Sequence, residues 1–433
     1  MENPVILIAS LMAILFALMF MGVPIAIALG ISTTINLMIF TDMDLLFIGQ
    51  NVYAALDSYA LLAVPFFILA SNIMAEAGIA RRLLVFAEAM TAGITGGLGM
   101  AGVLACAIFA AISGSSVATV VSIGTIVIPG MVKEGYDKKF ATALIACSGS
   151  LGILIPPSVL MIIFGVLADV SIGKLFAAGM VPGVILTIFL MIYVHIISKK
   201  RNYPKSPHLP PRERLRKIAQ NGSALLVPFM VLGGIYGGVV TPTEAAVLAT
   251  FMGLFMGFFV YKELKIKHLA GIFLRSAEMS SMILIILAFA YSFAFLLSFF
   301  RVPDLLTQMM FDAGINAWMF LLLINIILFF AGDFMDPASI MLIFTPLIVS
   351  LGSALGINLI HLGIVVTMNL EIGLITPPVG FNLYVGSSLS QLSLYDVMKA
   401  AIPFMIIIGV ALILITYVPS LSLMMPKLIF GSA

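Results

Sequence analysis

The sequence predicts an all-α polytopic membrane protein, built as an inverted repeat with two re-entrant helical hairpins. Three observations support this fold class: the composition, a series of apolar segments of membrane-spanning length, and Pro-Pro pairs at equivalent positions in the two halves. The chain has 433 residues, of which 62% are hydrophobic and 9% are charged, whereas soluble domains carry about 25% charged residues. So much apolar surface requires a lipid bilayer as its solvent.

Ten segments have the length of a membrane span, because a bilayer core needs about 20 apolar residues per helix. They are 4–21, 23–40, 61–77, 140–165, 174–198, 222–240, 243–261, 276–300, 358–386 and 400–425. The first segment lacks the basic start and the small-residue cleavage site of a signal peptide. We therefore expect it to be retained as a span.

Two further apolar segments, 95–131 and 316–352, are interrupted midway by polar or glycine-rich stretches. These stretches are ISGSSVATV (Ile112–Val120) and AGDFMDPAS (Ala331–Ser339). Each half of a segment has about 15 residues, which is short for a crossing, so a re-entrant hairpin fits better than two spans. Irregular backbone at membrane depth must be buried in protein or line a wet cavity. The hairpin tips are therefore candidate functional sites.

Basic residues predict the orientation in the membrane, because short basic loops stay in the cytoplasm. The segment Lys199–Lys217 holds eight of the 21 Lys and Arg residues, which makes 199–221 a cytoplasmic loop. Counting spans from this loop places both termini outside and makes the two hairpins enter from opposite faces. The amphipathic segment Tyr261–Arg275 is expected to lie along the interface, and Arg275, at a span end, is expected to snorkel.

An internal repeat appears when the sequence is shifted by 221 residues. The shift superposes Gly152 on Gly373, Pro156 on Pro377, Pro157 on Pro378, Gly165 on Gly386 and Pro182 on Pro403, without a gap. Because the topology runs the equivalent helices in opposite directions, the repeat is inverted, as in many secondary transporters. The predicted organisation is N-terminal helices 1–60, first repeat 61–198 with hairpin 95–131 and broken helix 140–165, loop 199–221, helices 222–300, and second repeat 316–425 with hairpin 316–352 and broken helix 358–386.

The Pro-Pro pairs predict two cation sites. Proline removes an N–H group and displaces the carbonyl four residues back, so each pair leaves carbonyls without helical partners. In hydrocarbon these carbonyls need a cation or another segment. We expect Na⁺ where each hairpin tip meets the broken helix of its own half. The expected ligands are Ser113, Ser116, Gly152, Ile155 and Pro157 in the first site, and Gly332, Gly373, Thr376 and Val379 in the second. The alternative is that the prolines are hinges without an ion.

Other polar residues in these regions are candidates for substrate binding. Ser115 and Ser158 have hydroxyl groups that can donate to a carboxylate, and the alternative is helix capping. Asp333 and Asp336 lie at the second tip, where a substrate or ion role and N-capping remain open. Glu371 precedes the second break. It can either balance the charge of a cation or have a structural role in a salt bridge or hydrogen bond.

Several motifs together resemble the large membrane subunit of TRAP (tripartite ATP-independent periplasmic) transporters, over nearly the whole chain. They are AAISGSSVATVVSIGTIVIPGM (Ala110–Met131), GSLGILIPPSVLMIIFG (Gly149–Gly165), KLFAAGMVPG (Lys174–Gly183), VVTPTEAAV (Val239–Val247) and MNLEIGLITPPVGFNLYV (Met368–Val385). The resemblance implies an elevator-type fold in the bacterial inner membrane and a sodium gradient. It also implies organic-acid substrates delivered by a periplasmic binding protein, and a separate small membrane subunit. The wording of the first two motifs is closer to C4-dicarboxylate members than to sialic-acid members.

Rival function classes fit the sequence less well. The chain has four histidines and no HExxH or Ser-His-Asp arrangement, so an enzyme is not expected. Cys106 and Cys147 have no CxxC spacing, so neither a metal-binding nor a redox role is expected for these two cysteines. There is no basic patch with interleaved aromatic residues for a nucleic acid. A channel would be built from subunits around an axis, whereas opposed hairpins in one chain suit alternating access. A dicarboxylate carrier that works without a binding protein remains the nearest alternative.

Overall fold

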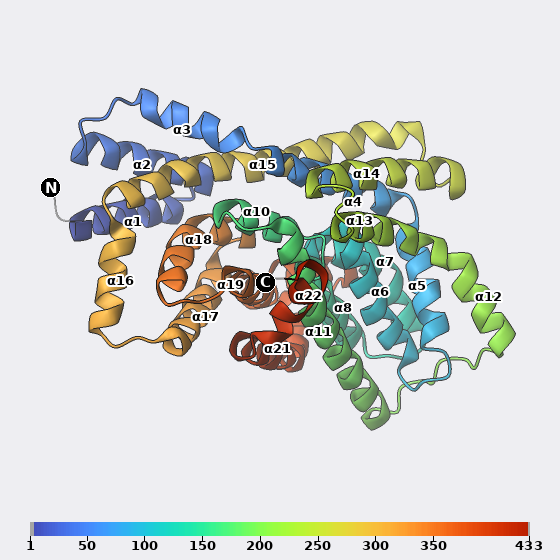
Figure 1. Ribbon diagram of the computed structural model, residues 1–433. Coiled ribbons are helices and arrows are strands. Elements are labelled where there is room, and N and C mark those ends of the chain that lie inside the picture. The colour runs from blue at the N-terminus through green and yellow to red at the C-terminus, as the bar shows by residue number, and fades with distance from the viewer. Residues whose placement is uncertain (1–3, 432–433) are drawn as a thin grey trace.

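The computed structural model describes residues 4–431, and in this range the regular secondary structure is helical (Figure 1). Within the described residues, ten helical segments are long and apolar enough to cross a membrane. The predicted all-α polytopic membrane fold is therefore confirmed.

One layer of helices is built along the long helix α15. Helices α2, α3, α4 and α16 pack on α15, α14 packs on α4, α13 packs on α14, and α1 packs on α2. Most of this layer runs along the upper edge of the molecule in Figure 1. The bounds are α1 (Pro4–Phe20), α2 (Ile25–Phe40), α3 (Leu46–Leu56), η1 (Tyr59–Leu62), α4 (Ala63–Glu76), α13 (Leu226–Tyr236), α14 (Pro242–Phe255), a π-helical turn η3 (Met256–Val260), α15 (Ile266–Phe299) and α16 (Val302–Asp312). We call this group the scaffold layer.

Most of the remaining helices form two equivalent halves. The first half contains α6 (Gly97–Ser113), α7 (Ser116–Lys133), α8 (Lys138–Gly149), α9 (Leu151–Leu154), α10 (Val159–Leu167) and α11 (Ile172–Lys200). The second half contains α17 (Ala317–Phe334), α18 (Pro337–Ala354), α19 (Leu359–Gly373), α20 (Phe381–Ser390), α21 (Leu394–Tyr417) and α22 (Ser420–Phe430). Helices α6 and α7 form one hairpin, and α17 and α18 form the other.

Packing between the halves is reciprocal. Helix α7 of the first hairpin contacts α20, and its equivalent α18 contacts α10. Likewise α8 contacts α21, and its equivalent α19 contacts α11. In each case, the contact between two helices of different halves is repeated by the contact between their two equivalents. Such reciprocal contacts are typical of two halves that are related by a two-fold axis. The connection before α8 is flanked by Lys133, Lys138 and Lys139, whereas the equivalent connection 355–358 has no charged residue, as expected when equivalent loops lie on opposite sides of a membrane.

One contact marks the position of the two-fold axis. Ser150 and Glu371 are equivalent residues, 221 positions apart, and Ser150 Oγ lies 2.7 Å from Glu371 Oε1. Both side chains are fully buried. The side chains of equivalent residues can approach each other this closely only beside the axis that relates the two halves. The axis therefore passes between α9 and α19, next to both Pro-Pro breaks.

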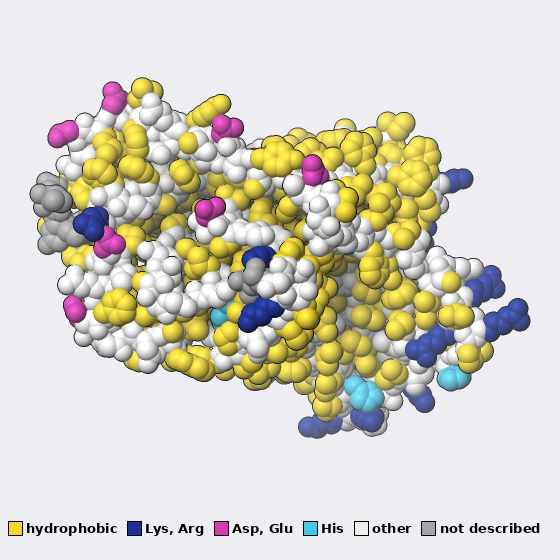
Figure 2. Space-filling view, viewed as in Figure 1, with side chains coloured by type: hydrophobic (Ala, Val, Ile, Leu, Met, Phe, Trp, Pro, Cys, Tyr) yellow, Lys and Arg dark blue, Asp and Glu magenta, His cyan; other side chains and the backbone are white. Residues whose placement is uncertain are grey.

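Charged groups are separated on the surface. Figure 2 shows Lys and Arg side chains gathered over α12 (Pro211–Asn221) and the end of α11, while most visible Asp and Glu side chains lie over α1–α3 and α16. The basic region contains the segment for which the sequence predicts a cytoplasmic loop. In membrane proteins, short loops with an excess of Lys and Arg are typical of the cytoplasmic side.

The structure differs from the sequence prediction at several connections. Residues 199–221 are not all loop, because α11 continues to Lys200 and α12 begins at Pro211, where proline is well accommodated in a first helical turn. The predicted interfacial segment Tyr261–Arg275 lies mostly within α15, which continues without a break to Phe299. Helices α3, α5 (Ile79–Met90), α16 and α22, and the short η2 (Gly222–Leu225), also lie outside the predicted spans or at their edges.

Helix α5 is fastened to the connection between η3 and α15 by one carboxylate. Glu263 Oε1 lies 2.8 Å from Arg82 Nη1, and its Oε2 lies 3.2 Å from Arg81 Nη2. The Arg82 guanidinium also stacks 3.7 Å from the centre of the Tyr261 ring. Partial burial opposes the charge of Glu263, but the hydrogen bond and charge of Arg82, together with Arg81, outweigh it and hold the pKa of Glu263 below its ordinary value.

Glu263→Gln is expected to lower the melting temperature of the solubilised protein slightly, by about 1–2 °C, since partly exposed ion pairs contribute about 1 kcal/mol or less. Because the folded pKa is lowered, the stabilisation is complete above the unfolded pKa of about 4.3 and is lost as the pH falls below it. A melting series across acidic pH measures both effects. Glu213→Gln, which removes an exposed pair with Lys217 within α12, is the control, and an equal effect of both variants would contradict the prediction.

Candidate functional site

The first hairpin turns within two residues. Helix α6 ends at Ser113, Gly114 takes a left-handed conformation with φ 59°, and Ser115 caps α7 by accepting from Ala118 N. A side chain at position 114 would be strained by this φ and would also lie 2.7 Å from the carbonyl oxygen of Pro157. The glycine therefore allows the tip to sit directly on the first Pro-Pro break.

The first break brings several predicted residues together. Gly152 packs so tightly on the tip that an added Cβ would lie 2.5 Å from the Ser115 carbonyl oxygen and 2.8 Å from Ser116 N. Within residues 4–431, the carbonyl oxygens of Ile155 and Pro157 accept no hydrogen bond. The Ile155 side chain points elsewhere, against Gly183 of α11. The free Pro157 carbonyl oxygen therefore lies against the tip, next to Gly114 between the serines.

Serine and threonine side chains at the first tip are bonded locally. Ser113 Oγ lies 2.9 Å from Thr119 Oγ1 and 3.2 Å from the Ser115 carbonyl oxygen. Ser116 Oγ donates to the Gly149 carbonyl at 3.1 Å. Ser158, which is fully buried, caps α10 by accepting from Met161 N. Ser115 and Ser158 therefore both have the capping contacts that the sequence leaves as an alternative to substrate binding.

The second tip repeats this arrangement with different side chains. Gly332 and Gly373 pack backbone to backbone, so that a Cβ on Gly332 would lie 2.9 Å from Gly373 Cα. Thr376 Oγ1 donates to the Ile372 carbonyl at 2.7 Å. The carbonyl oxygens of Thr376 and Val379 accept no hydrogen bond in the described part of the chain. Each hairpin tip therefore lies against the broken helix of its own half.

The two aspartates at the second tip have different environments. Asp336 caps α18 and binds both the backbone N–H and the hydroxyl of Ser339. Asp333 is 8% exposed, and its Oδ1 atom has no hydrogen-bond partner among the described residues. The carboxylate of Asp336 is therefore used for helix capping, whereas Asp333 Oδ1 is free to accept a hydrogen bond from a ligand.

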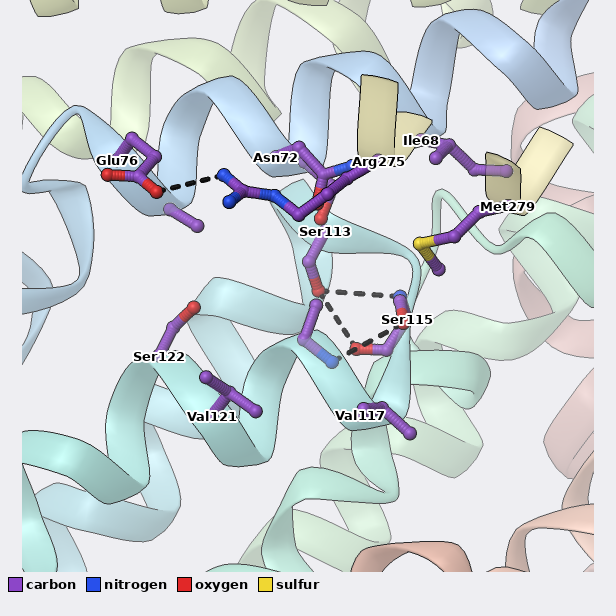
Figure 3. Close-up of a pocket in the computed structure, with 13 residues that line it drawn as sticks. Ile68, Asn72, Glu76, Ser113, Ser115, Val117, Val121, Ser122, Arg275 and Met279 are labelled. Carbon is purple, nitrogen blue, oxygen red and sulfur yellow. Dashed lines mark hydrogen bonds and ion pairs between the residues drawn. The ribbon is translucent and has the colours of Figure 1, made fainter. Parts of the chain in front are cut away.

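A cavity of about 380 Å³ separates the first tip from the scaffold layer (Figure 3). Its polar lining comes from α4, α15 and the first hairpin: Ser71, Asn72, Glu76, Arg275, Ser113, Ser115 and Ser122. Arg275 Nη2 lies 3.0 Å from Glu76 Oε1, and the side chains are 55% and 41% exposed. Figure 3 shows this pair on the cavity wall that faces Ser113 and Ser115. A second cavity, of about 490 Å³, lies between the second tip, including Asp336, and the scaffold helices α1, α2 and α15.

Comparison with known proteins identifies the family. Residues 12–421 match the family model of the tripartite ATP-independent periplasmic transporter, DctM component. The chain belongs to this family. It is 40% identical to a C4-dicarboxylate TRAP transporter large permease protein of Vibrio cholerae, over 98% of both chains. It is also 33% identical to a sialic acid TRAP transporter large permease protein of the same species, over 96% of this chain and 97% of the relative.

The fold of this TRAP large subunit resembles a solved transporter of low sequence similarity. The YdaH transporter of Alcanivorax borkumensis superposes with a TM-score of 0.61 at 15% identity, over 90% of each chain. The likeness supports the helical architecture alone.

The site of this TRAP large subunit contains residues that the sequence analysis missed. Asn382 of α20 reaches across to the first tip, where its Nδ2 atom lies 2.6 Å from Ser116 Oγ. Asn72 and Arg275 line the first cavity, although Arg275 was expected only to snorkel. An amide inside an apolar helix is a detectable signal for Asn382, whereas the position of Arg275 depends on how α15 packs.

Proposed function

We propose that this chain is the transporting subunit of a sodium-driven TRAP importer of organic acids, with C4-dicarboxylates as the favoured substrates. The observation that carries the proposal is the pair of breaks, each with free carbonyl groups against the tip of its own hairpin. Carbonyl groups of unwound membrane helices are the ligands by which secondary transporters bind a coupling cation near the membrane midplane.

Sodium is the proposed cotransported cation. At the first break, the Pro157 carbonyl oxygen lies against Gly114 of the tip, and Gly152 packs on the backbone of Ser115 and Ser116. The free carbonyl groups of Ile155 and Pro157 and the hydroxyls of Ser113 and Ser116 are the proposed ligands. At the second break, the candidates are Gly332, Gly373, Thr376 and Val379, which combine carbonyl oxygens with one hydroxyl. Both sets offer neutral oxygen atoms. A monovalent cation is the charge that such a set can hold without a carboxylate in direct contact.

The organic acid is proposed to enter the cavity between the first tip and the scaffold layer. Arg275 supplies a cation there, and Asn72 with Ser113 and Ser115 supplies neutral polar groups. The Arg275–Glu76 pair is more than one-third exposed on each side, so exchanging Glu76 for a substrate carboxylate costs little. Asp333 and Ser158 remain candidates in the other tip and break. The closer similarity to the C4-dicarboxylate relative, 40% against 33% for the sialic-acid relative, favours a dicarboxylate.

The proposed mechanism is an elevator movement in the bacterial inner membrane. The two halves, α6–α11 and α17–α22, would carry substrate and sodium past the scaffold layer. The scaffold helices α1 and α2, with the start of α15, are the proposed docking site for a separate small membrane subunit. A periplasmic binding protein would deliver the substrate, with both termini of this chain on the periplasmic side. The basic surface over α11 and α12 supports this orientation.

Reconstitution in proteoliposomes tests the proposal. The complex of this chain with its small subunit should take up labelled succinate when an inward sodium gradient and the cognate binding protein are both present. Replacement of sodium by choline should abolish uptake, because the carbonyl groups at the breaks then have no matching cation. Sialic acid serves as the competing substrate.

Each component of the proposal has its own contrary result. Uptake that persists in choline would exclude sodium coupling. Uptake without a binding protein would favour a carrier that works alone. Full uptake by this chain without a small subunit would exclude the proposed docking role of α1, α2 and α15. Uptake of sialic acid in preference to succinate would reassign the substrate.

A further inference from the structure

We propose that Asn382 couples the two cation sites. Binding of a cation that orders the second break would then also hold the first hairpin tip in its binding conformation. The inference rests on the proposed sodium sites and assigns to Asn382 a positioning role, not a ligand role. Its basis is that one fully buried side chain joins the break of one half to the tip of the other.

Asn382 belongs to the second break through its backbone. It is the second residue of α20, and its N–H group donates to the Leu374 carbonyl at 3.0 Å. This bond closes the loop that contains Thr376, the Pro-Pro pair and Val379. Any ligand that orders the loop therefore also fixes the start of α20.

The side chain of Asn382 belongs to the first half. Its Nδ2 atom lies 2.6 Å from Ser116 Oγ and 3.1 Å from the Ala146 carbonyl oxygen. Ser116 Oγ uses its own hydrogen to donate to the Gly149 carbonyl at 3.1 Å, so it acts as an acceptor toward Asn382. The hydrogen count thus assigns both amide hydrogens to the first half and fixes the orientation of the amide.

The connection exists in one direction only. The residue equivalent to Asn382 in the first half is Met161, which packs against Gly179 of α11. The residue equivalent to Ser116 is Pro337, which has no hydroxyl. The repeat therefore has a polar link from the second break to the first tip, and apolar side chains at the equivalent place. Although the link is asymmetric in structure, its effect on binding must be reciprocal, because coupling free energy is shared by both sites.

The matched control is Asn369. It is also a buried asparagine of the second half, and its Nδ2 atom donates to Asn325 O and Asn325 Oδ1, each at 2.9 Å. Its hydrogen bonds remain within the second half. Asn369→Ala and Asn382→Ala therefore each remove a buried amide with two donated bonds, but only the second cuts the connection between the halves.

The test measures the melting temperature and succinate uptake of the purified complex as functions of sodium concentration. The wild type should respond steeply, with a Hill coefficient above one. In Asn382→Ala the coefficient should fall toward one, and the sodium concentration for half-maximal response should rise by about fivefold or more. Asn369→Ala should lower the melting temperature in sodium-free buffer and keep the wild-type steepness.

Two contrary results are distinguishable. If Asn382→Ala lowers the melting temperature like Asn369→Ala but keeps the wild-type steepness, Asn382 only supports the structure and the coupling is refuted. If the wild type itself shows no response to sodium, the proposed coupling ion fails and this inference fails with it. Should Asn382→Ala not fold, Asn382→Ser keeps a polar group that is too short to reach both Ser116 and Ala146, and the same prediction applies to it.

Discussion

Replacement of Gly152 by alanine should nearly abolish uptake. The added Cβ would lie 2.5 Å from the Ser115 carbonyl oxygen, 2.7 Å from Ser115 C and 2.8 Å from Ser116 N. These are backbone atoms, so the hairpin tip must move by roughly 1 Å to restore ordinary contact. That displacement separates the tip from the free carbonyl groups of the first break. A misplacement of this size in a preorganised site costs about a hundredfold in rate, and sodium-driven uptake measures it.

The control for this prediction lies in the same hairpin. A Cβ at Gly130 of α7 would meet only Leu98 Cδ2, at 3.9 Å, so Gly130→Ala should keep its uptake. Gly373→Ala, which would place a Cβ 2.8 Å from Gly332 Cα, should impair the second site as Gly152→Ala impairs the first. Wild-type uptake by Gly152→Ala would show that transport does not require the close contact between tip and break.

Arg275→Gln should reduce the apparent affinity for succinate by about tenfold or more, because a hydrogen bond to a charged group contributes about 1.5–3 kcal/mol. The melting temperature should change little, since both side chains of the Arg275–Glu76 pair are more than one-third exposed. Glu76→Gln should not reduce the apparent affinity for succinate. Because this substitution removes the carboxylate that pairs with Arg275, the affinity should stay the same or increase. The concentration dependence of succinate uptake measures both.

Arg301→Gln is the charge-matched control. Arg301 follows α15 and pairs with Asp304 at 2.8 Å, on a side chain that is 79% exposed. It does not line the cavity of the first tip. If Arg275→Gln and Arg301→Gln affect succinate uptake equally, Arg275 acts only through the surface charge, and the cavity is not the substrate site.

The features that the sequence predicts well are those that proline and glycine determine locally. The Pro-Pro pairs place the breaks, and the polar stretches ISGSSVATV and AGDFMDPAS place the hairpin tips, because these residues dictate backbone conformation wherever they occur. The repeat also extends further than the Gly and Pro coincidences. Helix α7 (Ser116–Lys133) and helix α18 (Pro337–Ala354) have equivalent bounds, although little of their sequence is alike.

The features that the sequence does not predict depend on packing between distant elements. Helix α5 carries Arg81 and Arg82 on an amphipathic pattern, so a search for long apolar segments passes over it. The reach of Asn382 to Ser116 and the exposure of Arg275 to the first cavity both depend on which face of a helix meets which neighbour. The residue type alone does not show which way a side chain points, because the same residue on another face of its helix would point into lipid.

The contact between Ser150 and Glu371 places an unusual restriction on this one position of the repeat. In an assembly of two identical halves, a residue on the symmetry axis meets its own copy, like a residue at the centre of a homodimer interface. Two glutamates there would bring two acidic groups together out of water, which is costly. A serine opposite a glutamate instead provides a donor for an acceptor. Two identical glutamates could not complement each other at this position. The first half therefore places a serine there and the second half a glutamate, so the two halves are nearly equal in shape but differ in the residue that each contributes at the axis.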